Sequence, residues 1–388
     1  NVASRFIDDI AATQPSASAV AGDQSLTYSQ LQKLVNRAGN ALRTAGCNEG
    51  DRFLMCLPDS ADFIVSFFGA LKVGAIAVPV SPKSTLEQHA HYLSTAMPKF
   101  AIVASQSFPE FRAAKAAARE SIVTFVVGAS PETLGPAELD WSGTVKAASD
   151  VLDPYECSAS DPAVVLYSSG TTGTQKAIAH SHSSMIAVSQ NVGRGVFGLR
   201  SGDRLLSASS LFFAFGLGFG MFLPLSVGAS TVAHPDKSNL ERLAELMVLN
   251  RPTILAAVPN MLPVVVNASR SRLNIDLASI RLIVSAGEPL PASVFEGFQR
   301  HFGIEVLDGI GSTEMLNHFV SSRPGLSRPG SCGTGVPGCE RPNIRQFGDA
   351  PIQRSIPVTP LRFDANQHRT CAPRRGRLLF LHCRRELE

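Results

Sequence analysis

Short apolar runs alternate with longer amphipathic segments along most of this chain, and that alternation limits the fold more than any other feature. Residues 52–57 (RFLMCL) form one apolar run, residues 60–73 follow with helical spacing, and residues 75–80 (AIAVPV) form the next run. Strands separated by helices of ten or more residues are typical of βαβ units. The sequence therefore predicts an α/β fold with a mostly parallel sheet.

The same two patterns, short apolar runs for strands and helical spacing of apolar residues for helices, locate the other elements. Residues 26–46 place apolar side chains at helical spacing up to Gly46, with Thr27 or Ser29 as the candidate cap, and residues 85–96 are predicted as another helix. Further strands are predicted at residues 100–104, 122–127, 163–167, 253–258, 282–285 and 305–308.

Size and composition exclude several classes of protein. With 388 residues, 44% of them hydrophobic, the chain can bury two or three cores, and its net charge of +3 gives no reason to expect nucleic-acid binding. The longest apolar stretch, residues 211–227, contains three glycines and a proline, so neither a membrane span nor a secretion signal is predicted. Seven scattered cysteines without C-x-x-C spacing indicate reduced thiols in a cytoplasmic protein. Because the chain starts at Asn1, we expect its true start to be missing or removed.

The last fifty residues differ from the rest. Residues 339–388 contain ten arginines, no lysine and no sustained periodicity. A basic interaction tail is one interpretation, and an altered reading frame is the one we favour. Two regions are therefore predicted, residues 1–338 and an aberrant tail at 339–388.

One loop carries the strongest chemical signal. Residues 167–176, YSSGTTGTQK, directly follow a predicted strand. Small residues let backbone N–H groups approach phosphate oxygens, hydroxyls add donors, and Lys176 supplies a compact positive charge. The spacing is not that of a Walker A loop. A plain turn with a surface lysine would explain any three of these residues, but the whole string predicts a phosphate-binding loop.

This loop resembles the signature [ST]-[SG]-G-[ST]-[TS]-G-x-P-K of the adenylate-forming superfamily, with Gln175 in place of proline. The resemblance implies the large N-terminal domain of such an enzyme, with stacked, mostly parallel β-sheets flanked by helices. It also implies that the loop binds ATP. The nucleotide-binding residues would be Ser168, Ser169, Gly170, Thr171 and Gly173, and the catalytic ones Thr172 and Lys176.

Two further motifs follow in the superfamily's order. Residues 285–291 (SAGEPLP) resemble the segment that lines the adenine pocket, and residues 308–314 (DGIGSTE) resemble the element that holds adenine and the α-phosphate. In that element Glu314 would have a catalytic role and serve Mg²⁺, and a glutamate just beyond a strand suits a hard cation that bridges phosphates. Alone, the second string would more often be a loop before a helix. The residues implied in nucleotide binding are Gly287, Glu288, Pro289, Asp308, Gly309, Ile310, Gly311 and Thr313.

Residues 211–229 (LFFAFGLGFG…PLSVGA) resemble the benzoate-CoA ligase branch. A flat, apolar aromatic acid fits a slot of glycines and aromatic rings. Core packing is the alternative for these phenylalanines, and we favour it for Phe212 and Phe222. In this sequence Phe215 stands where that branch often has tyrosine, and Asn317 stands where it often has histidine. The loss of two hydrogen-bonding groups indicates that the preferred ring substituent differs from that of benzoate's closest relatives. The residues implied in the aryl pocket are Ala214, Phe215, Leu223, Gly311, Asn317 and His318.

The resemblance implies ATP-dependent activation of a benzoate to its acyl-adenylate, then transfer to coenzyme A. It implies no nucleic-acid or membrane partner and allows a homodimer. The superfamily's T-G-D segment, hinge and C-terminal lysine domain are not recognisable after residue 338, so we expect impaired catalysis. Another acyl-CoA synthetase, an amino-acid adenylation domain and a non-catalytic nucleotide-binding remnant stay as alternatives. His180 and His182 are predicted on a helix, in a structural or a catalytic role.

Overall fold

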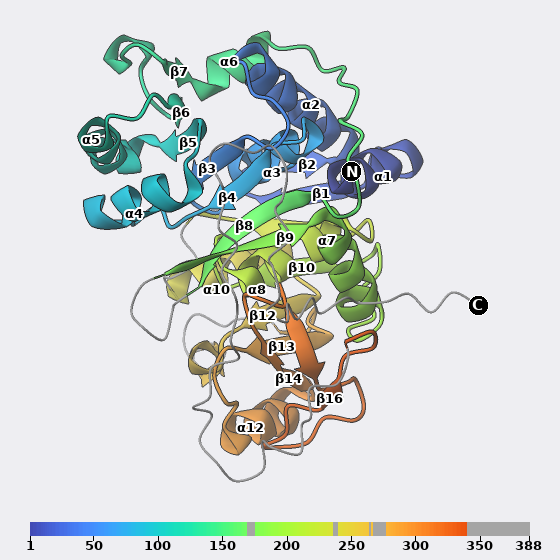
Figure 1. Cartoon of the computed structure of the whole chain (residues 1–388). Helices are drawn as coiled ribbons and strands as arrows, with labels where there is room; N and C mark the ends of the chain where they lie inside the picture. The colour runs from blue at the N-terminus through green and yellow to red at the C-terminus, as the bar shows by residue number, and fades with distance from the viewer. Residues whose placement is uncertain (169–174, 236–239, 264, 267–276, 340–388) are drawn as a thin grey trace, which may run out of the picture.

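The computed structural model describes residues 1–168, 175–235, 240–263, 265–266 and 277–339. These residues form two β-sheets with helices around them (Figure 1). Strands β3 to β7 of one sheet lie in the upper half of the view and strands β12 to β16 of the other in the lower half, while β1 and β2 of the second sheet reach up beside the first. The prediction of mostly parallel sheets flanked by helices is confirmed.

The first sheet has seven strands in the order β7-β6-β5-β3-β4-β8-β9, and every pair is parallel except β8–β9. One face packs against α2, α3 and α6, and the other against α4 and α5. The strands are β3 (Arg52–Cys56), β4 (Ile76–Pro79), β5 (Phe100–Ala104), β6 (Val123–Val127), β7 (Glu138–Asp140), β8 (Pro162–Ser168) and β9 (Lys176–Ser181). The helices are α2 (Tyr28–Thr44), α3 (Ala61–Lys72), α4 (Leu86–Ala96), α5 (Phe108–Ala118) and α6 (Trp141–Ala147).

The second sheet has nine strands in the order β16-β15-β14-β13-β12-β10-β11-β1-β2. Its outer face packs against α10 (Leu240–Asn250) and α12 (Ala292–Phe302). The strands are β1 (Ser18–Gly22), β2 (Leu26–Thr27), β10 (Arg204–Ser207), β11 (Ser230–Ala233), β12 (Ile254–Ala257), β13 (Leu282–Ala286), β14 (Val306–Gly311), β15 (His318–Ser321) and β16 (Thr334–Gly335).

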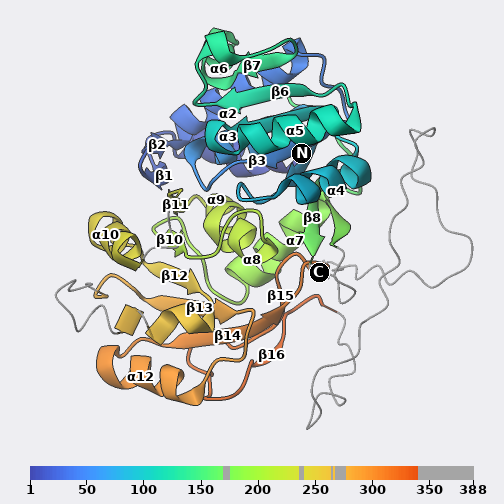
Figure 2. The ribbon, with the colours of Figure 1, turned by 90° about the vertical axis from the view of Figure 1, so that its left-hand side faces the viewer.

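A single apolar core joins the two sheets. It includes Phe53 of β3, Val284 of β13 and Phe219 of the π-helical turn η5 (Gly218–Phe222), so both sheets bury one face against shared side chains. Figure 2 shows the helices between the sheets. They are α7 (His182–Val188), the π-helical turn η4 (Ser189–Arg194), α8 (Ala214–Leu217) and α9 (Leu223–Leu225). We call the boundary between the two sheets the seam; at this boundary β9 of the first sheet meets the segment that follows β14 of the second.

Helix α2 begins where the sequence offers a capping box. Thr27 Oγ1 accepts a hydrogen bond from the Gln30 N–H at 3.3 Å, and Gln30 Oε1 accepts one from the Thr27 N–H at 2.9 Å. Two backbone donors that a helix start leaves unpaired are thereby satisfied. Of the two candidate caps, Thr27 is correct and Ser29 is wrong.

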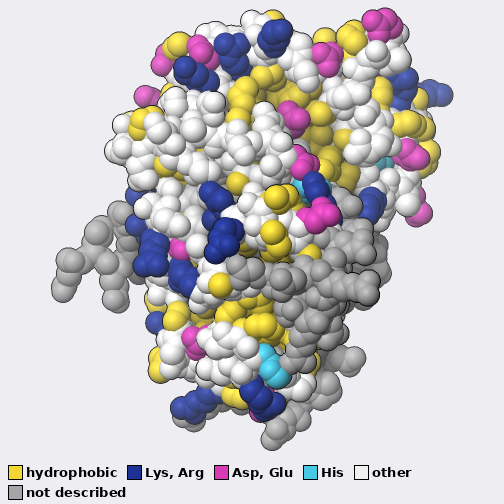
Figure 3. Space-filling view, turned by 180° about the vertical axis from the view of Figure 1, so that it is seen from behind, with side chains coloured by type: hydrophobic (Ala, Val, Ile, Leu, Met, Phe, Trp, Pro, Cys, Tyr) yellow, Lys and Arg dark blue, Asp and Glu magenta, His cyan; other side chains and the backbone are white. Residues whose placement is uncertain are grey.

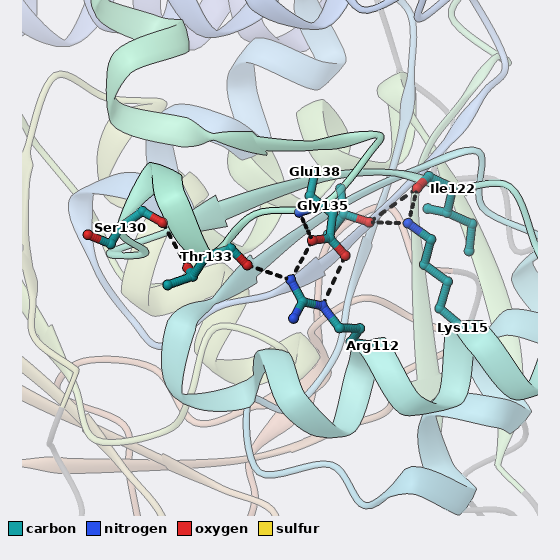
Figure 4. A network of polar contacts seen from close by, with 8 residues as sticks. Arg112, Lys115, Ile122, Ser130, Thr133, Gly135 and Glu138 are labelled. Carbon is teal, nitrogen blue, oxygen red and sulfur yellow. Dashed lines mark hydrogen bonds and ion pairs between the residues drawn. The ribbon is translucent and has the colours of Figure 1, made fainter.

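A polar network fixes the outer edge of the seven-stranded sheet. Arg112 of α5 donates to both carboxylate oxygens of Glu138 on β7, and Lys115 donates to the Ile122 carbonyl (Figure 4). This geometry ties α5 to the edge strand, at a distance from the motifs described below.

Most predicted elements are confirmed to within a residue or two, with one clear error. His180 lies on β9 and not on a helix, because residues 176–181 pair with the strand before the loop; His182 does begin a helix, α7. The core-packing prediction holds for the fully buried Phe222 and is wrong for the half-buried Phe212, whose ring lies against the exposed Phe213. Residues 340–388, and with them nearly all of the predicted tail, lie outside the described residues.

The surface mixes charge types. The face in Figure 3 carries basic, acidic and apolar side chains together. No helix within the described residues is both long and apolar enough to cross a membrane.

Candidate functional site

The predicted phosphate-binding loop connects β8 to β9, which pair as antiparallel strands. Ser168 ends β8 and pairs directly with Lys176, the first residue of β9, whose side chain is exposed. The loop therefore leaves and re-enters the sheet at adjacent positions. Residues 169–174 of this loop lie outside the described residues, and five of them are predicted site residues: Ser169, Gly170, Thr171, Thr172 and Gly173.

The strand β9 carries its functional candidates on one face. Side chains alternate along a strand, so Lys176 and His180 point the same way. His180 is buried, and its Nε2–H donates to the Thr313 carbonyl at 2.8 Å. This hydrogen bond crosses the seam, because Thr313 follows β14 of the other sheet.

The segment after β14 forms a tight turn that carries Glu314. The Thr313 carbonyl also accepts from the Leu316 N–H at 3.1 Å, and Leu316 has φ 61° with a buried side chain. Glu314 is exposed at the top of this turn and close enough to raise the pKa of His180, although burial has the larger effect and lowers that pKa to about 4. The turn thus places a carboxylate beside a neutral imidazole.

The predicted adenine-binding residues lie at the ends of two parallel strands. Gly287, Glu288 and Pro289 follow β13 and are exposed, whereas Asp308 on β14 is buried. Asp308 Oδ2 accepts from Cys332 Sγ at 3.4 Å, and its Oδ1 has no partner among the described residues. Burial raises the Asp308 pKa. Beyond it, Gly309 is buried, and Ile310 and Gly311 are exposed at the strand end.

The residues predicted to line the aryl pocket lie in or beside an aromatic enclosure, a cluster of rings around His318. Ring centroids of three phenylalanines lie close to its imidazole: Phe197 at 5.6 Å, Phe215 at 5.7 Å and Phe219 at 5.6 Å. A Cβ added to Gly309 would lie 2.2 Å from the His318 ring, so only glycine permits this approach. His318 is 2% exposed, and burial lowers its pKa to about 4.

Asn317 sets the tautomer of that imidazole. Its Oδ1 accepts from the His318 backbone N–H at 2.9 Å and lies 2.9 Å from His318 Nδ1, so Nδ1 carries the proton. Asn317 Nδ2 and His318 Nε2 have no partner among the described residues. A Cβ on Gly218 would lie 2.2 Å from Asn317 Nδ2 and 3.6 Å from a Leu223 methyl, which brings Leu223 to the same place. Ala214 is half-buried beside Phe215.

Comparison with known proteins identifies the family of this chain. The family described as "AMP-binding enzyme" matches residues 7–345. The chain belongs to this family. It is 33% identical to the 4-hydroxybenzoate-CoA/benzoate-CoA ligase of Rhodopseudomonas palustris, over 84% of this chain and 59% of that protein. The benzoate-CoA ligase of Thauera aromatica is 34% identical, over 81% and 58%.

Solved structures of AMP-binding enzymes share the fold. An anthranilate CoA ligase, AuaEII, in complex with anthranoyl-AMP superposes with a TM-score of 0.83 at 30% identity, covering 88% of this chain and 65% of that one. A benzoate CoA ligase from Burkholderia xenovorans LB400 gives 0.79 at 30% identity, with 88% and 66% covered. The chain thus spans about three fifths of the length of the curated relatives it matches.

The donor set of this AMP-binding enzyme fits a magnesium ion that is shared with a nucleotide. Within the described residues, no three His, Cys, Asp or Glu side chains cluster as a metal site. Magnesium usually keeps several waters and binds one or two carboxylates together with substrate phosphates. The exposed Glu314, across the seam from the Lys176 strand, suits that mode of binding.

Sequence reasoning missed three residues that the structure brings to the site. Phe219 lies within residues 211–229, the glycine- and phenylalanine-rich segment assigned to the aryl pocket, so the sequence motif could have identified it. Phe197 lies in no motif. His91 of α4 donates through Nε2 to the Gln175 carbonyl at 3.0 Å, next to Lys176, and nothing in its local sequence indicates this contact.

Proposed function

We propose that this protein activates an aromatic carboxylate with ATP and transfers the acyl group to coenzyme A. The substrate class is benzoate or a substituted benzoate. Relatives whose names specify benzoate, hydroxybenzoate and anthranilate support this class. A cytoplasmic location, a homodimer, and the absence of nucleic-acid and membrane partners stay predictions from the sequence.

One juxtaposition carries the proposal. His318, which the rings of Phe197, Phe215 and Phe219 surround, follows Glu314 by four residues. The turn that carries Glu314 is hydrogen-bonded through Thr313 to β9, the strand that begins with Lys176. Aromatic side chains that suit a flat ring and polar groups that suit a nucleotide are therefore carried by one short segment of chain. Binding sites for small molecules commonly combine an apolar pocket with a few polar groups in this way.

The chemistry consists of two displacements. A carboxylate oxygen attacks the α-phosphorus of ATP, the bond to the bridging oxygen breaks, and pyrophosphate leaves. The CoA sulfur then attacks the carbonyl carbon of the adenylate, AMP leaves, and the thiol proton passes to solvent. Such reactions need alignment of the reactants and neutralisation of phosphate charge more than covalent help from the protein.

Specific roles follow for the residues at the site. Lys176 neutralises charge on the departing pyrophosphate, and Ser168 and the loop residues after it hold phosphate oxygens. Glu314 holds Mg²⁺, which supplies further charge neutralisation when it is bound. Ala214, Phe215, Leu223, Asn317 and His318 surround the aromatic ring, and the segments that start at Gly287 and Asp308 hold the adenine.

The test is ATP-pyrophosphate exchange with a panel of benzoates, on the wild type and on Lys176→Ala. We expect exchange with at least one benzoate, and a loss of about 100-fold or more in the variant, the scale seen when one charge-stabilising donor is removed. Arg300→Ala is a matched control, because Arg300 is an exposed cation on α12. Exchange that survives in Lys176→Ala would contradict the role of the lysine, and a folded wild type without exchange would contradict the function.

A further inference from the structure

We propose that His180 is a positioning residue that holds the Glu314 turn against the strand of Lys176. This inference rests on the proposed function, because it assigns His180 to the nucleotide half of that site. It concerns a residue that lies four positions after Lys176 on β9 and touches the turn from the other sheet.

The hydrogen bond of His180 falls on the atom that closes the turn. The Thr313 carbonyl accepts from the Leu316 N–H at 3.1 Å and from His180 Nε2 at 2.8 Å. Within the described residues, no other hydrogen bond joins a β9 side chain to residues 312–316. The position of the turn relative to β9 therefore depends on this imidazole.

The turn needs external support. Leu316 is not a glycine, yet it has φ 61° and is 1% exposed. A left-handed conformation of a branched, buried residue persists only where the surrounding structure holds it. His180 supplies part of that restraint from the other sheet. Its hydrogen bond is to Thr313, the residue directly before Glu314.

The geometry favours positioning over direct proton transfer. His180 is 6% exposed, and its Nε2–H is committed to a backbone carbonyl. Lys176 lies on the same face of β9, roughly 13 Å away along the strand. One strand thus presents a cation to the phosphates and restrains the turn that holds the carboxylate.

The experiment compares His180→Leu, which removes the donor, with His180→Gln, which keeps an N–H donor. Binding of ATP to the full chain is measured calorimetrically with Mg²⁺ and with EDTA, without aromatic acid. We expect His180→Leu to reduce the affinity gained on adding Mg²⁺ by roughly threefold to tenfold, the range for one lost hydrogen bond. His180→Gln should recover most of that gain.

Two further measurements separate positioning from general damage. In the exchange assay, His180→Leu should raise the KM for MgATP and leave the KM for the aromatic acid within about twofold of wild type. In a double-mutant cycle with Glu314→Gln, the double variant should show a KM for MgATP little higher than that of the more impaired single variant. Both substitutions remove the same function, the placing of the Glu314 carboxylate. His301→Leu, at an exposed histidine of α12, is the matched control.

Each contrary result has a defined meaning. Wild-type Mg²⁺ dependence in His180→Leu, equal rises in both KM values, or no recovery in His180→Gln would overturn the inference. A wild type that binds no MgATP would also overturn it. A wild type that binds MgATP but exchanges pyrophosphate with no acid would contradict the proposed function, while the binding comparison would still decide the role of His180.

Discussion

Gln175, which replaces the usual proline of the signature loop, is held by helix α4. The His91 Nε2–H donates to its carbonyl at 3.0 Å, and a hydrogen bond with Gln175 partly offsets the rise that burial causes in the pKa of Tyr92. His91 and Tyr92, which are consecutive residues of α4, therefore both contact Gln175, the residue before Lys176. The carbonyl contact is compatible with proline, whereas the side-chain contact is particular to glutamine.

We expect these two contacts to differ in importance for catalysis. His91→Leu removes the donor to the backbone and should raise the KM for MgATP by about threefold to tenfold in the exchange assay. Gln175→Pro keeps the carbonyl and should stay within about twofold of wild type. An effect of Gln175→Pro as large as that of His91→Leu would show that the glutamine side chain, and not the backbone, holds the loop.

Local motifs allowed part of the site to be predicted at the residue scale. Asp308, Glu314, Asn317 and His318 lie in or beside one string, and the structure gathers them at one strand end. Phe197 and His91 come from η4's C-terminal side and from α4, and they reach the site only through tertiary packing. A linear pattern contains no information on such contacts. The roles assigned to all of these residues stay predictions, and residues 169–173 also lie outside the described part of the chain.

At the scale of single elements, the start of α2 offers a clean stability test. Thr27→Ala removes the side chain that caps the Gln30 N–H, and should lower the free energy of unfolding by about 1 kcal/mol. Ser29→Ala is the control, because Ser29 lies inside the helix and does not cap it. Urea unfolding followed by far-UV circular dichroism measures both variants. An equal loss in both would show that the hydroxyl of Thr27 has no special role.

Elements with a clear periodicity were predictable, and those with weak periodicity were not. The buried run of β5 was located at the observed bounds, Phe100–Ala104. By contrast β9 (KAIAHS) carries a charge, a histidine and three small residues, and only its pairing with β8 makes it a strand. The division into two sheets depends on long-range pairs such as β1–β11, which local pattern cannot reveal.

At the scale of the whole molecule, three buried histidines lie at or near the seam. His180 bonds the two sheets, His318 begins β15 inside the aromatic enclosure, and His182 Nδ1 accepts from the Val2 N–H at 3.3 Å. Burial is the main cause that lowers the pKa of each to about 4. Of the three, His180 is the one whose hydrogen bond joins the two sheets directly.

Acid should consequently weaken the whole fold before the carboxylates are protonated. A histidine with a pKa of 6.5 when unfolded and about 4 when folded stabilises the protein fully above pH 6.5, and this contribution is lost as the pH falls toward 4. At pH 5 the loss is about 2 kcal/mol for one such residue. We expect His318→Leu, which fits the apolar enclosure, to reduce the drop in unfolding free energy between pH 7 and pH 5 by about this amount.

Urea unfolding at the two pH values measures that drop. Fluorescence of Trp141, the single tryptophan, reports on the seven-stranded half, and circular dichroism reports on the whole chain. His301→Leu, an exposed site, should leave the drop unchanged. If both probes move together and only His318→Leu flattens the pH dependence, the two halves unfold as one unit that the buried imidazoles make acid-sensitive. If the drop persists in His318→Leu, the acid sensitivity comes from groups away from the aromatic enclosure.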